Sequence, residues 1–277
     1  MLLVWANALV FARVNGLEMG TSAWWGIHWG SIIRSEKKKR FYHGYFKETP
    51  LITKCIFTLH QFFWKVKKNP SLAVLPAVEQ AAKTLFLFDK AITHEQLFMP
   101  LNAHRDFIKE QLYNLLQADK KAQLVSYPIP AIAVHIRRGD FKLANQTTDL
   151  SFFISAIELV RHTKKSIVPV TIFTDAGKEE LQEILALPQT SLAAEKADIL
   201  DILLMSQSSI IILSQSSTFS YWAAFLSDAF VIMPHNDWQE GIKPNGENYR
   251  EVKWNKDNPE DVALLQNLLM KGNLKAV

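Results

Sequence analysis

Residues 131–234 alternate between short apolar runs rich in β-branched side chains and longer segments whose apolar residues recur at helical spacing. This alternation is typical of a parallel β-sheet covered by helices, and it predicts an α/β, doubly wound sheet of Rossmann-like topology. Strands are expected at 131–136, 168–173, 209–213 and 229–233, and helices at 149–162, 178–187, 198–207 and 219–227. In such a fold, ligands bind at the carboxyl ends of the strands, next to the amino ends of the following helices.

The remainder of the chain suggests a second domain. With 277 residues, 48% of them hydrophobic, the protein is long enough for two cores. The first half has helical apolar patches separated by aromatic-rich loops and prolines, and Tyr127–Pro130 forms an extended linker before the first clear strand. We therefore expect a mainly helical or mixed domain over 1–127, a Rossmann-like domain over 128–250 and a helical tail over 251–277.

Charge is distributed unevenly between the two halves. Residues 1–125 contain 17 basic and 9 acidic side chains, whereas residues 126–277 contain 14 and 18. The basic half is suited to an anionic acceptor or to peripheral contact with a membrane surface. For the run 37–40, Lys-Lys-Lys-Arg, a solvated basic face is the favoured interpretation. Because no interleaved basic and aromatic motif of a recognised type is present, nucleic acid is not an expected partner.

Neither a membrane span nor a disulfide framework is expected. The most apolar stretch, Leu2–Ala12, is much shorter than the roughly 20 residues that a transmembrane helix needs. No basic segment precedes it, as a signal peptide would require, and Cys55 is the single cysteine. These features predict a soluble, cytoplasmic protein.

Arginines follow the first predicted strand. The sequence His135-Ile136-Arg137-Arg138-Gly139-Asp140 places an imidazole, two guanidinium groups and a carboxylate where an α/β fold binds its ligand. Adjacent arginines can bind a diphosphate through charge-assisted hydrogen bonds. The structural alternative is that Arg138 forms an ion pair with Asp140. We expect a structural role of this kind for one of the two arginines but not for both.

A hydroxyl-rich turn follows the third predicted strand. Ser214-Gln215-Ser216-Ser217-Thr218-Phe219-Ser220 leads directly into a helix, whose unsatisfied N–H groups and dipole favour an anion. Simple N-capping would need only one of these hydroxyls, Ser216 or Ser217. The surplus of hydroxyls favours a phosphate-binding turn.

Four blocks within 131–234 together resemble the α-1,2-fucosyltransferases in order and spacing. The blocks are 135–141 (HIRRGDF), 173–175 (FTD), 201–206 (DILLMS) and 216–226 (SSTFSYWAAFL). The resemblance implies an inverting glycosyltransferase of the two-domain GT-B type that uses GDP-fucose as donor substrate, a glycan as acceptor, and no cofactor or divalent metal. The sequence agrees on the metal, because it contains no Asp-X-Asp triplet of the kind that commonly holds a cation against a diphosphate.

The resemblance also suggests roles for the site residues. It makes Arg137 the main diphosphate contact and places His135 beside the donor nucleotide, and Asp201 matches an aspartate that receives the guanine edge. The expected donor-binding residues are Arg137, Arg138, Asp175, Asp201, Ser216, Ser217, Thr218 and Phe219. Without a cation, the departing GDP would be stabilised by Arg137 and by the 216–219 turn. The expected catalytic residues are Arg137, His135 and Asp140. Asp140 is the candidate general base, with orientation of an arginine as an equal alternative.

The sequence departs from the family pattern in two places. Tyr221-Trp222 stands where the family usually carries two tryptophans, and packing of this helix against the sheet is the favoured interpretation of the pair. A typical member begins with a glycine-rich loop, whereas Met1 here leads directly into an apolar stretch. Because this glycine-rich loop is missing, one alternative is a transferase-derived binding protein with little or no activity. A separate alternative is a transferase that uses another nucleotide sugar. The aromatic cluster Trp24, Trp25, His28 and Trp29 fits acceptor binding and a core role equally well.

Overall fold

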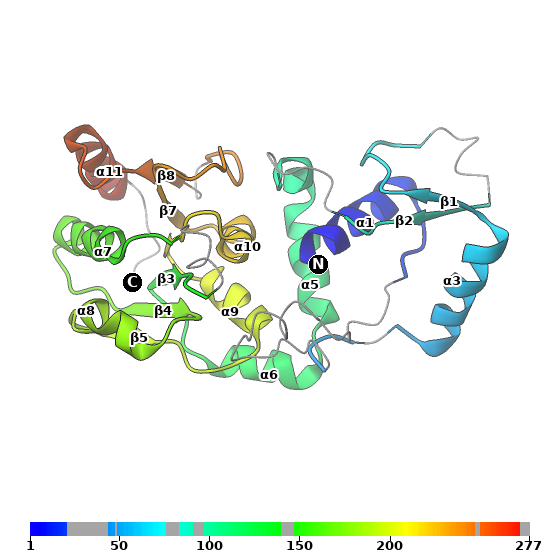
Figure 1. Cartoon of the computed structure of the whole chain (residues 1–277), viewed down its shortest axis with the longest axis horizontal. Coiled ribbons are helices and arrows are strands. Elements are labelled where there is room, and N and C mark those ends of the chain that lie inside the picture. Colours follow the sequence, from blue (N-terminus) through cyan, green and yellow to red (C-terminus); the bar gives the residue numbers. More distant parts are fainter. Residues whose placement is uncertain are drawn as a thin grey trace. The chain divides into compact units, whose positions relative to one another are not determined.

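The computed structural model describes residues 1–20, 44–47, 49–75, 83–90, 97–139, 147–246 and 250–271. These residues form two compact units, 1–121 and 122–277 (Figure 1). The division falls within helix α6 (Ala118–Ser126), just ahead of the linker at which we placed the domain boundary. The aromatic cluster 24–29, the basic run 37–40 and the candidate base Asp140 lie outside the described residues.

The second unit contains a six-stranded sheet in which every neighbouring pair is parallel. Its strands are β3 (Ile132–Ile136), β4 (Val170–Thr174), β5 (Thr190–Leu192), β6 (Ile210–Ile212), β7 (Phe230–Pro234) and β8 (Arg250–Trp254). Their spatial order is β5-β4-β3-β6-β7-β8. Counted along the chain this order is 3-2-1-4-5-6, which is the strand order of doubly wound nucleotide-binding sheets. The predicted parallel α/β sheet is confirmed.

Helices cover both faces of this sheet (Figure 1). They are α7 (Leu150–Lys164), the 3₁₀ turn η3 (Lys178–Leu181), α8 (Gln182–Leu185), α9 (Asp198–Met205), α10 (Thr218–Leu226) and α11 (Pro259–Lys271). Helix α7 packs against α8 and α11, and α9 packs against α10. Strand β3 alternates between the two layers: Ile132, Val134 and Ile136 join the core beneath α7, and His135 points to the opposite face.

Helix α7 shows how local sequence builds this unit. The Asp149 carboxylate accepts a hydrogen bond from the Ser151 N–H at 2.7 Å, which caps the helix. Phe153, Ala156, Ile157 and Val160 follow at spacings of three and four residues, and all are fully buried. The cap thus determines where the helix begins, and the apolar stripe determines which face packs against the sheet.

The sheet has two edge strands that the sequence analysis did not predict, β5 and β8. Strand β8 lies largely in the range that we assigned to a helical tail, and α11 follows it. Only Val252 and Trp254 of this strand are buried, and the other three residues, Arg250, Glu251 and Lys253, are charged. The strand therefore lacks the apolar run by which the other strands were predicted. The helix expected over 178–187 is also split, into η3 and the four-residue α8.

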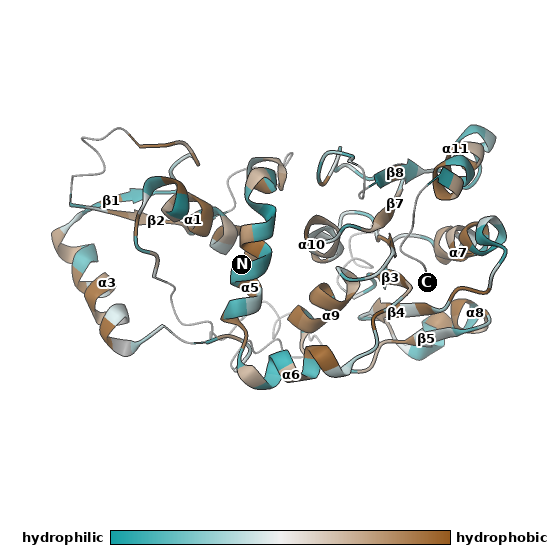
Figure 2. Ribbon diagram, turned by 180° about the vertical axis from the view of Figure 1, so that it is seen from behind, coloured by the Kyte–Doolittle hydropathy of each residue, from teal (hydrophilic) through white to brown (hydrophobic). Residues whose placement is uncertain are grey.

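The first unit is mixed. It contains α1 (Leu2–Asn15), α3 (Leu51–Phe63), the strands β1 (Lys65–Lys68) and β2 (Thr84–Leu87), the 3₁₀ helix η1 (Met99–His104) and α5 (Arg105–Leu115). Helix α1 packs against η1 and α5, and β1 pairs in parallel with β2. The buried Asn15 side chain ties the end of α1 to the 73–75 segment by accepting a hydrogen bond from the Leu75 N–H at 2.6 Å. Figure 2 colours the ribbon of these elements by the hydropathy of each residue. No helix in the described segments has the length and apolar character to cross a bilayer.

Candidate functional site

The site lies where the sheet reverses its direction of winding, between β3 and β6. These strands are hydrogen-bonded neighbours, with Ile132 opposite Ile210 and Val134 opposite Ile212. The chain leaves β3 toward β4 on one side and leaves β6 toward β7 on the other. Their carboxyl ends therefore bring together the arginine loop and the hydroxyl turn, at the position where doubly wound folds bind nucleotides.

Ser214 joins these two loops. Its hydroxyl donates to the His135 carbonyl at 2.8 Å and accepts from the Arg137 N–H at 2.8 Å. The side chain is 1% exposed, so both bonds are shielded from water. The surplus of hydroxyls in this turn therefore has a partly structural use, because Ser214 and also Ser220, which donates to the Ser217 carbonyl, are committed internally.

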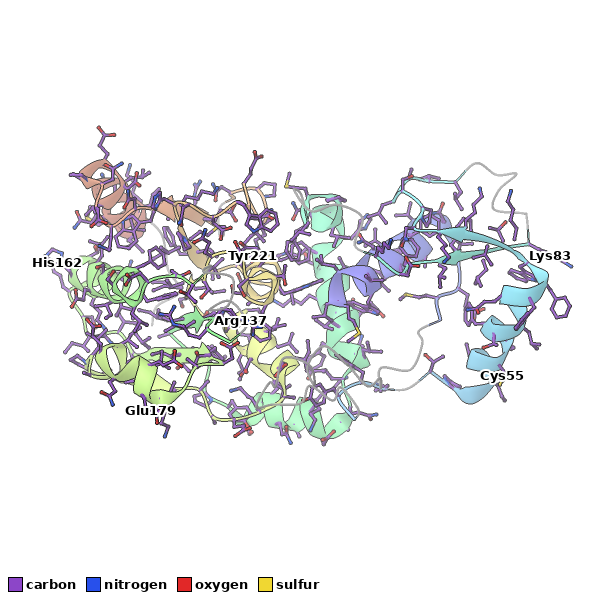
Figure 3. The ribbon with its side chains drawn as sticks, viewed as in Figure 1. Cys55, Lys83, Arg137, His162, Glu179 and Tyr221 are labelled. Carbon is purple, nitrogen blue, oxygen red and sulfur yellow. The ribbon has the colours of Figure 1, made fainter. Side chains whose placement is uncertain are left out.

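Asp175 organises the arginine loop from the end of β4. One carboxylate oxygen lies 2.5 Å from Nη1 of Arg137, and the other accepts the Arg138 N–H at 2.7 Å. A side chain at position 139 would have its Cβ 2.6 Å from the same carboxylate, which explains the glycine there. Arg137, whose place in the second unit is labelled in Figure 3, is thereby held by a carboxylate. Since a guanidinium carries five N–H donors in a planar fork, it can serve a carboxylate and a phosphate together.

Arg138 has a different environment. Its Nη1 donates to the Thr148 carbonyl at 2.7 Å, and the residue is 9% exposed. Thr148 in turn accepts the Gln215 N–H through its hydroxyl at 2.8 Å. Arg138 thus fastens the segment before α7 to the site, and Arg137 remains the stronger candidate for a diphosphate contact. Asp140, its expected alternative partner, is outside the described residues.

His135 and Phe219, both expected near the donor, contact each other. Their rings stack with centroids 5.0 Å apart and an interplanar angle of 29°. His135 is 4% exposed on β3, whereas Phe219 is half-buried in the first turn of α10. The pair connects the end of β3 to the start of α10 across the face opposite α7.

The amino end of α10 has the features of an anion site. Ser217 occupies the N-cap position, but its side chain makes no capping hydrogen bond. The first N–H groups of the helix, from Thr218 onward, have no acceptor within the helix, and the helix dipole places partial positive charge there. Thr218 is exposed. Ser216 has a φ of 57° and directs its own N–H toward Asp237 Oδ2 at 3.3 Å, so this amide serves the protein.

Asp237 is the residue that the sequence analysis missed. It lies in the loop after β7, is 3% exposed, and accepts the Tyr221 hydroxyl at 2.5 Å and the Gln239 N–H at 3.1 Å. Burial raises the pKa of Asp237 even though these hydrogen bonds and Lys253 act in the opposite direction. Burial and the neighbouring carboxylate also raise the pKa of Tyr221. A buried phenol requires a hydrogen-bond partner for its hydroxyl. Tyr221 in a helix predicted to pack against the sheet was therefore the one feature of the sequence that pointed to a residue such as Asp237.

Asp201 lies on α9 and is engaged by a lysine. Lys196 Nζ lies 2.8 Å from Asp201 Oδ1, and the lysine side chain is 2% exposed. The same ammonium lies 4.9 Å from the ring centroid of Tyr127 and 5.2 Å from that of Phe173. An ionised carboxylate offers about four lone-pair sites, so Asp201 can accept further donors beside Lys196.

Three acidic groups in the described part of this site contact the protein's own cations and donors. Asp175 pairs with Arg137, Asp201 pairs with Lys196, and Asp237 accepts from Tyr221. No cluster of three or more histidine, cysteine or acidic side chains with metal-binding geometry occurs within the described ranges. The fold and the site together define an α/β protein with a doubly wound parallel sheet, in which an arginine loop and a helix amino end lie at the same sheet edge.

Comparison with known proteins identifies the family. Residues 92–256, more than half of the chain, match the glycosyl transferase family 11. The chain belongs to this family, which is the α-1,2-fucosyltransferase family, and the protein is a glycosyltransferase. A comparison with curated proteins gave no significant match.

Solved structures with a similar arrangement include two of NodZ. One is the NodZ α-1,6-fucosyltransferase soaked with GDP-fucose, with 14% identity, a TM-score of 0.46, and coverage of 82% of this chain and 88% of that chain. The other is the fucosyltransferase NodZ from Bradyrhizobium, with 13% identity, the same TM-score and the same coverage.

Proposed function

We propose that this protein transfers L-fucose from GDP-fucose to a glycan hydroxyl with inversion, as an α-1,2-fucosyltransferase of the two-domain GT-B type. The family membership supports the reaction class. The proposal depends most on one observation, the Ser214 hydroxyl that joins the Arg137 loop to the turn before α10. Through it, the backbone of the Arg137 loop is joined to the turn before a helix amino end, and Asp175 holds the guanidinium of the same loop.

The proposed chemistry is a single displacement. The acceptor oxygen attacks the anomeric carbon of fucose as the bond from that carbon to the β-phosphate oxygen breaks, and the bonding electron pair leaves with GDP. Arg137 and the first N–H groups of α10 would stabilise the charge that develops on the diphosphate. Because Asp175 already orients the guanidinium, little reorganisation would be needed during the reaction. Asp140 is the proposed acceptor of the proton.

The remaining site residues would bind the nucleotide. Asp201 would accept the guanine N–H groups beside its ion pair with Lys196. His135 and Phe219 would flank the donor through their stacked rings. In this arrangement Arg138 and Thr148 position the loop, because the arginine donates to a protein carbonyl.

Thermal unfolding with GDP in the presence of a chelator tests the proposal. GDP at millimolar concentration should raise the Tm of the wild-type chain, since a ligand that binds only the folded state stabilises it. Arg137→Ala should abolish this shift, whereas Arg250→Ala, an exposed arginine on β8, should preserve it. Turnover of GDP-fucose would then establish the donor. Absence of a GDP shift in the wild-type chain would contradict nucleotide binding, and a GDP shift without turnover would indicate a transferase-derived binding protein.

A further inference from the structure

Helix α3 has an apolar stripe on its outer surface. The stripe consists of four apolar residues at spacings of four, three and four: Ile52, Ile56, Leu59 and Phe63. Their exposed fractions are 75%, 44%, 55% and 80%, in that order. Phe62 beside them is 79% exposed. This recurrence places the side chains on one face of the helix, and Figure 2 shows the apolar colouring of α3. Contiguous exposed apolar surface of this kind is typical of an interaction site.

The adjacent face of α3 is the one that packs inward. Thr53, Phe57, His60 and Trp64 repeat with the same spacing, offset by one residue, and each is partly buried. His60 stacks on Trp64 with ring centroids 3.7 Å apart. The helix therefore has two distinct faces. The partly buried face packs inward, and the stripe is a separate, exposed face.

The chain segment that carries the stripe is basic. Residues 49–75 contain four lysines and no acidic residue. Three of them, Lys65, Lys67 and Lys68, lie in β1, which starts two residues after α3 ends, and Lys65 and Lys68 are exposed. Lys68 Nζ lies 3.8 Å from Asp89 Oδ2, but the two side chains are 65% and 41% exposed, so solvent screens the pair.

We propose that α3 and β1 form a docking surface for an anionic lipid bilayer, with the apolar stripe inserted at the interface and the lysines near the headgroups. An exposed apolar helix face combined with neighbouring lysines matches the two signals of interfacial helices. Lysine is depleted in protein interfaces, which favours a lipid surface over a protein partner here. The 13 residues of α3 are too few to span a bilayer, so the helix would lie along its surface.

Vesicle binding by the full chain tests this proposal. The chain should float with vesicles of phosphatidylcholine and phosphatidylglycerol, and far less with phosphatidylcholine alone. Lys65→Ser/Lys68→Ser should weaken binding to the anionic vesicles about 25-fold, on the basis of about fivefold for each lysine near such a surface. Phe62→Ser/Phe63→Ser should abolish binding, and high salt should weaken it.

Two controls keep the outcomes distinct. Leu264→Ser/Met270→Ser removes apolar side chains that are 48% and 64% exposed on α11, and this variant should bind like the wild-type chain. The stabilisation by GDP should be unchanged in every variant, so a failure of the proposed donor site would be seen separately. Equal binding to neutral and anionic vesicles, or full binding by the Phe62/Phe63 variant, would overturn the proposal. So would a concentration-dependent dimer that this variant dissociates, without vesicle binding by the wild-type chain.

Discussion

The Tyr221 hydroxyl should determine the stability of the loop that carries Asp237. Tyr221 is fully buried, and its hydroxyl is the closest donor to the Asp237 carboxylate, at 2.5 Å. In Tyr221→Phe, Oδ1 would retain the Gln239 N–H at 3.1 Å and lose the phenol. Removing one partner of a buried polar group costs about 1–3 kcal/mol, so we expect a loss of about 2 kcal/mol in the free energy of unfolding.

The loss should depend on pH, and its sign follows from the pKa of Asp237. Burial raises that pKa above its ordinary value of 3.8, so the stability due to this group is greatest below 3.8 and falls as pH rises through the raised pKa. The Tyr221 hydrogen bond partly opposes this rise. In Tyr221→Phe the pKa of Asp237 should therefore rise further. The difference in unfolding free energy between variant and wild type should be smallest in acid and should grow toward neutral pH.

Urea unfolding at acidic and neutral pH measures this difference. Tyr113→Phe on α5 is the matched control, because Tyr113 is 39% exposed and the substitution should change stability by no more than about 0.5 kcal/mol. If Tyr221→Phe cost no more than this control at neutral pH, the hydrogen bond would contribute nothing and the reasoning would be refuted. Because Asp237 also accepts the Ser216 N–H, Tyr221→Phe should in addition reduce the Tm shift produced by GDP.

Three further substitutions test other contacts. Ser214→Ala should lower the unfolding free energy by about 2–4 kcal/mol in urea titrations and weaken GDP binding, because it leaves two shielded backbone groups of the site without their partner. Asp149→Ala should cost about 1 kcal/mol at neutral pH. The Ser151 N–H lowers the pKa of Asp149, so this cost should disappear as pH falls below the lowered value, and an unchanged cost in acid would contradict the cap. Asp201→Asn should leave the buried Lys196 without its carboxylate, destabilise the fold by about 3 kcal/mol, and equalise the Tm shifts produced by GDP and ADP if Asp201 recognises guanine.

The sequence predicted the centre of the sheet better than its edges. Strands β3, β4, β6 and β7 are nearly continuous apolar runs, because helices cover both faces of the sheet there. Strand β5 has only three residues, none of them fully buried, and β8 carries charge on its exposed face. Edge strands need less apolar surface, and the periodic signal on which sequence reasoning depends is correspondingly weak.

The same distinction applies to the site. That the arginine loop and the hydroxyl turn meet follows from topology, since both succeed central strands of one parallel sheet. The hydrogen bonds that hold these two loops together cannot be predicted from the topology, because they join residues far apart in sequence. Arg137 and Ser214 are 77 positions apart, and Thr148 and Gln215 are 67 positions apart. A hydroxyl near a binding turn can serve the ligand or the protein, and sequence alone does not distinguish the two uses. Ser214 illustrates this ambiguity.

If Arg137 binds the donor as proposed, its ion pair with Asp175 would have two opposing effects on an incoming diphosphate. Asp175 reduces the positive charge available in the ground state, since its oxygen lies 2.5 Å from the guanidinium. It also holds the guanidinium in place in the folded protein, so the proposed donor would not need to immobilise a flexible arginine. In the proposed reaction, charge on the GDP oxygens would increase as the bond to fucose breaks, so a fixed cation would gain more interaction in the transition state than in the ground state. An arginine restrained by a carboxylate suits leaving-group stabilisation better than tight retention of the donor.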